Sequence, residues 1–232
     1  LSAVIVAAAA PTVASLAFGA TGVLAVALTL TGLCGSVAAA RAVRDGVATP
    51  PVLWWAVAAV AVIAVVRSPI GSHDLWSYAF YGRMWSHYGV NPYNAVPAQF
   101  SHDVLDPLVR WRHTPSGYGP LFTLYSAGAT RVAGNSVIAM RLFFQGAAAV
   151  SVLGCLGVLH RARHTRTLVL VALAPFVWVA LVNGGHNDAL VAAGVLGAVV
   201  AFDKQLWLLA GVLVAVAGMI KLPGLFVAVP FV

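Results

Sequence analysis

Long apolar runs follow one another along most of this chain, and they constrain its fold more than any other feature. They cover approximately residues 1–12, 16–40, 51–70, 136–160, 167–183, 188–202 and 206–220, and a further run starts at 222. Runs of roughly 20 residues are long enough to cross the hydrocarbon core of a bilayer as helices. Only 8% of the residues are charged, against about 25% in soluble domains, so a water-facing surface cannot be built. We predict an all-α, polytopic transmembrane helical bundle.

Both ends of the chain look like internal positions of a longer protein. The sequence starts at Leu1 rather than at Met and finishes on Phe231 and Val232 within an apolar run, so we expect a fragment. The first apolar stretches carry no basic n-region and are not typical of a secretory signal peptide. We predict one transmembrane domain over residues 1–232.

The net charge of +7 comes mainly from arginines in the connections between apolar runs. In a soluble protein this surplus would hint at nucleic acid, but here the positive-inside bias explains it, so we expect no nucleic-acid partner. Cys34 and Cys155 both lie in apolar segments and are too few for a disulfide framework or a zinc site. The sequence predicts no cofactor and no metal.

Two basic clusters set the expected orientation of the chain in the membrane. They consist of Arg41 and Arg44, and of Arg161, Arg163 and Arg166. Both should face the cytoplasm. The run at 51–70 then leaves the cytoplasm, which places the long polar stretch 71–134 on the outer side.

The segment 118–133 decides whether this orientation is consistent. If it crossed the membrane, the second basic cluster would lie outside. It is short and holds Thr123, Ser126, Thr130 and Arg131, so we predict an interfacial helix within an outer loop at 71–134. The following runs then place Asp74, Asp188 and Lys221 on the same outer side.

Asp74 follows the run at 51–70 directly and is the first candidate for chemistry. A carboxylate at a membrane edge is costly and is therefore a functional candidate. Alternatively, Asp74 only caps the next helix, and the two roles are compatible. His73 and Tyr78 beside it are candidates for substrate contact.

Two turns rich in Gly and Pro follow, at 91–94 and 114–120, and a structural role is favoured for them. Tyr118 and neighbouring aromatic residues can also stack on a sugar. Arg110 and Arg112 form a basic patch that binds either a phosphate or, with slightly better support, lipid headgroups.

A third polar site stands at 183–188 and ends in His186, Asn187 and Asp188. Its glycine pair lets the backbone approach a ligand closely. A plain loop with Asp188 as helix cap is the alternative, and a metal site is weakly indicated. The fourth candidate, Lys221, either extends to the interface or neutralises a phosphate.

Taken in order, these motifs resemble actinobacterial polyprenol-phosphate-mannose-dependent alpha-1,6-mannosyltransferases of the C-type membrane glycosyltransferase superfamily. The similar stretches are 74–78, 89–93, 114–121, 185–190 and 221–223, and together they span roughly residues 50–225. The resemblance implies a catalytic carboxylate at Asp74, interfacial helices in the loop that follows, and a polyprenyl-phosphate mannose donor. One departure concerns His73, which stands where many members carry a second acid. This leaves Asp103, Asp106 or Asp188 as possible partners of Asp74, although His102 and Asp103 otherwise look like solvated loop residues.

We therefore predict a membrane glycosyltransferase that moves mannose from a polyprenyl-phosphate donor to a glycan or lipoglycan acceptor at the outer face. Asp74 would act as the general base. Lys221, with Arg110 or Arg112, would hold the donor phosphate, and 186–188 would bind the sugar. The alternatives are a transporter or flippase for lipid-linked sugars, which should show broken helices and polar residues near the membrane midplane, and a structural assembly subunit.

Overall fold

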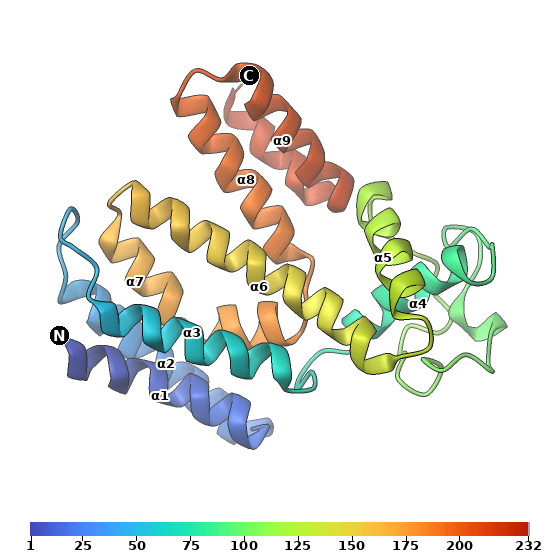
Figure 1. Cartoon of the computed structure of the whole chain (residues 1–232), viewed down its shortest axis with the longest axis horizontal. Coiled ribbons are helices and arrows are strands. Elements are labelled where there is room, and N and C mark those ends of the chain that lie inside the picture. Colours follow the sequence, from blue (N-terminus) through green and yellow to red (C-terminus); the bar gives the residue numbers. More distant parts are fainter. Residues whose placement is uncertain (232) are drawn as a thin grey trace. The chain divides into compact units, whose positions relative to one another are not determined.

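The structure, a computed structural model, describes the backbone of residues 1–231 and the side chains as far as Phe226. The described residues contain helices and no strands, and 71% of the chain is helical, so the all-α prediction is confirmed (Figure 1). Val232, at the end of the last apolar run, lies outside the described residues.

Contacts divide the chain into two compact units. Unit 1 comprises Leu1–Ser72 and Ala149–Gly184, and unit 2 comprises His73–Ala148 and the residues from Gly185 onward. Both units therefore combine segments from the two halves of the sequence. The predicted single domain with an outer loop at 71–134 stays a prediction.

Unit 1 is built on apolar helices that lie side by side, namely α1 (Ser2–Phe18), α2 (Gly22–Arg41), α3 (Pro51–Val66) and α7 (Thr165–Leu173). In Figure 1 these helices form one group. The second half of α6 (Val137–Arg161) also belongs to this unit.

The first helix is longer than the sequence predicts. The apolar run was expected to end near residue 12, but α1 continues past Pro11 to Phe18. Gly19 ends the helix in the left-handed conformation, with φ of 62°, which glycine adopts without steric cost. Arg67 then donates from Nε to the carbonyl of Leu16 at 3.1 Å, a favourable place for a cation at a helix C-terminus.

The run at 167–183 is also not one straight helix. After α7 ends at Leu173, the chain resumes as a π-helical segment, Val177–Asn183, and the two pieces are bent by 67°. Pro175 lies between them, and proline ends a helix because it lacks an N–H group and clashes with the preceding turn.

Unit 2 contains α4 (Asp74–Ser86), α5 (Pro120–Ala133), the first half of α6, α8 (Asp188–Asp203), α9 (Trp207–Ile220) and two short 3₁₀ segments, Pro97–Gln99 and Leu222–Phe231. Within it, α4 packs on α5 and α8 packs on α9. Gly82 allows the close approach of α4 to α5, because a Cβ there would lie 2.3 Å from the carbonyl oxygen of Ser126. The apolar core of this unit includes Leu75, Phe80, Met140 and Phe144.

Two helices of the described chain, α2 and α6, are long and apolar enough to cross a membrane. The bent pair made of α7 and Val177–Asn183 is a third candidate if it forms one span, and α1, α3 and α9 are apolar but shorter. A full polytopic bundle of the C-type kind therefore remains a proposal.

Candidate active site

Four titratable side chains from separate parts of the sequence meet within unit 2. Asp74 is the first residue of α4, His186 lies in the turn before α8, Asp188 opens α8, and Lys221 follows α9. His186 Nδ1 lies 3.9 Å from a carboxylate oxygen of Asp74 and equally far from one of Asp188. Lys221 Nζ donates to Asp188 Oδ1 at 2.8 Å. The structure thus joins three of the four predicted polar sites. We call Asp74, His186, Asp188 and Lys221 the Asp74 cluster.

Asp74 does not act as a helix cap. His73 occupies the N-cap position of α4, and no side-chain hydrogen bond caps this helix. Instead, Asp74 Oδ1 accepts a hydrogen bond from the indole Nε1 of Trp111 at 3.1 Å. The Asp74 side chain is 32% exposed, so it is open to a ligand while one oxygen is held in place.

The turn before α8 brings His186 against α4. Gly185 has φ of 62°, and a Cβ at this position would lie 2.6 Å from Leu75 Cδ1, so the turn requires glycine. The expectation that Asp188 could be only a helix cap is wrong, because Asn187 holds the N-cap position and α8 has no side-chain cap. Asp188 is instead 46% exposed and paired with Lys221.

Asn187 is the most unusual residue of this turn. It is fully buried, with 0% exposure. Neither its amide nitrogen nor its amide oxygen has a hydrogen-bond partner among the described residues. Because an unpaired buried polar group is costly, it requires an explanation beyond packing.

Two tyrosines line the apolar side of the Asp74 cluster. The ring of Tyr78 is buried, packs edge-on against Tyr118 with centroids 4.8 Å apart, and lies 6.5 Å from the His186 ring. Burial raises the pKa of both the Tyr78 and the Tyr118 hydroxyl above the usual value. Both phenols therefore stay neutral at ordinary pH and supply ring faces rather than charge.

The remaining predicted site residues are less closely tied to the Asp74 cluster. His73 uses Nδ1 to bond the carbonyl of Leu108 at 3.1 Å, which fixes the loop after α4. Arg112 pairs with Asp106, with Nη2 and Oδ1 2.8 Å apart. Arg110 is exposed on the same loop, and no ion pair joins it to the Asp74 cluster in the described part of the chain.

Asp103 is neither a solvated loop residue nor a free partner for Asp74. It is 5% exposed, accepts from Arg83 Nε at 2.7 Å, and accepts from the Tyr88 hydroxyl at 2.8 Å. Arg83 also donates to the carbonyl of Gly134. This buried network ties α4 to the end of α5, so Asp103 is structural. Among the three candidate partners of Asp74, the structure brings only Asp188 into the cluster.

Sequence reasoning missed the direct role of Trp111. It lies 37 residues from Asp74 along the chain, and no local pattern connects the two positions. Its only signal was its place between Arg110 and Arg112 in a polar loop.

An apolar cavity of about 590 Å³ lies within unit 2. Tyr93, Tyr118, Met219, Leu222 and Leu225 are among its lining residues. Gly119 and α9 touch along its edge, because the Gly119 N–H donates to the carbonyl of Ile220 at 2.9 Å. A Cβ on Gly119 would clash with the backbone of Met219. Among the described residues, no group of three His, Cys, Asp or Glu side chains is placed to hold a metal ion.

Comparison with known proteins gives two matches. Residues 2–232 match the family described as alpha-(1->6)-mannopyranosyltransferase, N-terminal domain. The chain is 28% identical over 218 residues to alpha-(1->6)-mannopyranosyltransferase A of Mycobacterium tuberculosis. That alignment covers 91% of this chain but only 41% of the relative. No solved structure gives a significant match.

Proposed function

Because this chain belongs to the alpha-(1->6)-mannopyranosyltransferase family, matching its N-terminal domain, we propose that it forms part of a membrane enzyme that transfers mannose. The donor is a polyprenyl-phosphate mannose, the acceptor is a glycan or lipoglycan, and the new linkage is alpha-1,6. The observation that carries this proposal is the Asp74 cluster, in which Asp74 lies beside His186 and Asp188 bonds Lys221. It offers a base and a cation in one place.

Asp74 acts as the general base in this proposal. The acceptor hydroxyl oxygen attacks the anomeric carbon of the mannosyl group while its proton passes to Oδ2 of Asp74, the oxygen that lies 3.9 Å from His186 Nδ1. The bond between that carbon and the phosphate oxygen breaks, and its electron pair stays on the lipid phosphate. A positioned base of this kind contributes about 10²–10⁴-fold to rate. Trp111 orients the carboxylate through the other oxygen.

Lys221 stabilises the charge that develops on the leaving phosphate. Its ammonium group is already at the site, held by Asp188 at 2.8 Å, and it has two further N–H donors for the phosphate. A cation aimed at developing charge costs little reorganisation when the reaction occurs. His186 separates the two carboxylates, and the buried amide of Asn187 can bond an ordered internal water behind them.

The apolar cavity of unit 2 suits the lipid part of the donor. Its lining includes Met219, Leu222 and Leu225, and Leu222 directly follows Lys221 in the sequence. A prenyl chain seated there would bring its phosphate toward Lys221. Burial of apolar chain is favourable by about 25 cal/mol per Å², so the cavity adds affinity without adding charge.

The proposed orientation places the Asp74 cluster on the outer side of a multi-pass cell-membrane protein. α5 is about 21 Å long and carries Thr123, Ser126, Thr130 and Arg131, whereas the equally short α9 is apolar throughout. This polar content supports an interfacial helix. Cysteine-accessibility labelling in intact cells checks the orientation. We expect external labelling at position 188 and none at position 163, and strong external labelling at 163 would overturn it.

The alternative of a lipid-linked sugar transporter predicts a broken helix with polar groups exposed at its break. A broken helix is present, at 165–183. However, Asn183 at its end accepts from the Ile70 N–H and donates to the carbonyls of Ala64, Arg67 and Ser68. These bonds use the amide for packing inside unit 1. Across the break itself, Trp178 Nε1 donates to the carbonyl of Ala172 at 2.7 Å, so these polar groups serve the fold.

The test is a membrane assay of the full-length protein with radiolabelled polyprenyl-phosphate mannose. We expect Asp74→Asn to lower turnover by about 100-fold or more, while Asp203→Asn, which removes an exposed acid at the end of α8, leaves turnover unchanged. Both variants must match the wild type in expression and melting temperature. Near-normal turnover by folded Asp74→Asn protein would reject Asp74 as the base.

A further inference from the structure

A second cavity lies in unit 1, and polar and basic side chains line it. Its volume is about 480 Å³, within the usual range for small-ligand sites. Two connections form it, the one after α2 and the one between α6 and α7. The lining side chains include Thr49, His160, Arg161, Arg163 and Thr165.

The two connections are held together by hydrogen bonds between residues more than 100 positions apart in sequence. The Gly46 N–H donates to the carbonyl of Arg163 at 3.0 Å, and Thr165 Oγ1 donates to the carbonyl of Val47 at 2.9 Å. Thr49 Oγ1 lies 3.1 Å from His160 Nδ1. The cavity is therefore a formed site rather than a gap between independent loops.

Arg163 has a backbone conformation that normally belongs to glycine. Its φ is 58°, and it ends α6 with the paired bonds from His164 N to Leu159 O and from Arg163 N to His160 O. Helices that end in this way usually place glycine at the left-handed position, because a Cβ is strained there. An arginine retained at a strained position is a candidate for function.

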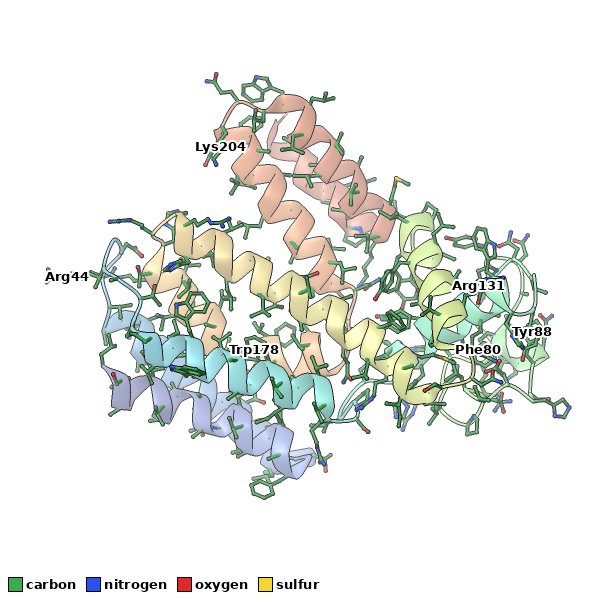
Figure 2. All side chains as sticks on the ribbon, in the orientation of Figure 1. Arg44, Phe80, Tyr88, Arg131, Trp178 and Lys204 are labelled. Carbon is green, nitrogen blue, oxygen red and sulfur yellow. The ribbon has the colours of Figure 1, made fainter. Side chains whose placement is uncertain are left out.

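Positive charge around this cavity is largely unpaired. Arg161 and Arg163 line the cavity, and the two connections and the helix ends beside them also carry Arg41, Arg44 and Arg166 against a single acid, Asp45. Asp45 is engaged by the backbone N–H of Arg166, whose own Nε donates to the carbonyl of Val43. In the described residues, the guanidinium groups of Arg161 and Arg163 have no ion-pair partner, and both side chains are exposed. Figure 2 shows Arg44 on the connection after α2.

We propose that this cavity binds the phosphate group of an anionic phospholipid. Arginine pairs with phosphate through two parallel N–H bonds, and basic pockets at the ends of membrane helices bind anionic headgroups. The membrane source is favoured because α2 ends at Arg41 and α6 ends at Arg161, and these are the two helices of the described chain that can each cross a bilayer alone. Their ends lie where headgroups lie. This site is independent of the mannosyl-transfer proposal.

Arg163→Gly is the decisive variant. It deletes the guanidinium while giving the left-handed position the residue that suits it, so the helix end is preserved. Gln205→Gly is the matched control, because Gln205 also has a positive φ, 56°, at the equivalent end of α8, with Leu206 N bonded to Ala201 O. Arg41→Gln controls for loss of charge in the same unit outside the cavity lining.

Full-length protein in detergent would be titrated with phosphatidylglycerol, with phosphatidylcholine as the neutral reference, and retained lipid would be counted by native mass spectrometry. We expect Arg163→Gly to weaken phosphatidylglycerol binding about tenfold or more with an unchanged melting temperature. The two control variants should change it less than about twofold, the level of a general charge effect.

Three outcomes would overturn the proposal. Equal losses in Arg163→Gly and Arg41→Gln would mean a diffuse electrostatic attraction without a site. Unchanged binding in folded Arg163→Gly protein would remove the arginine from any phosphate contact. Tighter binding of soluble glycerol phosphate than of phosphatidylglycerol would assign the cavity to a free phosphate compound instead of a lipid.

Discussion

Asn183 in unit 1 and Asn187 in unit 2 differ in the hydrogen bonding of their side-chain amides. Both are asparagines, four positions apart, and both are fully buried. The Asn183 amide bonds one N–H and three carbonyls in the last turn of α3 and the chain that follows it, whereas both amide atoms of Asn187 lack a partner among the described residues. The bonding capacity of Asn183 is used by the fold, which it stabilises, whereas that of Asn187, buried next to His186 and Asp188, is not used by the described residues.

The largest expected effect concerns Asn183. Asn183→Ala removes the partner of the Ile70 N–H and of three carbonyls within unit 1, and the bonds lost are one buried and three partly buried. We expect a loss of about 3 kcal/mol in the free energy of unfolding, because each unsatisfied buried group costs roughly 1–3 kcal/mol and the costs overlap. The melting temperature in detergent would fall by several degrees. An unchanged melting temperature would mean that these bonds are not what holds the bent segment to α3.

The next effect concerns Lys221. Lys221→Gln removes the ammonium that pairs with Asp188 and that would meet the donor phosphate. We expect KM for the polyprenyl-phosphate donor to rise about 10–100-fold, since a hydrogen bond to a charged group is worth roughly 1.5–3 kcal/mol. The exposed Lys204, labelled in Figure 2 at the end of α8, provides the control through Lys204→Gln. An equal rise in both variants would indicate only a general effect of charge on a lipid substrate.

The smallest stability effect is expected for Asn187. Asn187→Ala deletes an amide that makes no hydrogen bond with the described residues, so the free energy of unfolding should change by less than about 1 kcal/mol. Turnover should nevertheless fall several-fold, because an ordered water behind His186 and Asp188 loses its partner. Thermal melting and the transfer assay on the same preparation check both parts. A fall in melting temperature as large as that of Asn183→Ala, together with normal turnover, would mean that Asn187 also serves only the fold.

Sequence alone was sufficient for the features that depend on local composition. The all-α class, most helix positions and the candidate site residues Asp74, Asp188 and Lys221 follow from apolar runs interrupted by polar residues. The contacts between residues far apart in the sequence could not be predicted in this way. Nothing local shows that Trp111 bonds Asp74 or that Asp103 is buried against Arg83, because both depend on how the loop at 87–119 folds back on α4. The π-helical bend near Pro175 and the extension of α1 past Pro11 were missed for a related reason, since the effect of a proline depends on the packing around it.

The central claim is that Asp74 accepts the proton during mannosyl transfer, and single-turnover kinetics of the full-length protein test it most directly. With saturating donor, Asp74→Asn should slow the transfer step about 100-fold or more while the Kd for the donor stays within about twofold of the wild-type value, because Asn keeps the size of the side chain and can still accept from Trp111. A transfer step of normal rate combined with a much weaker Kd would contradict the account, since Asp74 would then bind the substrate without taking part in the reaction.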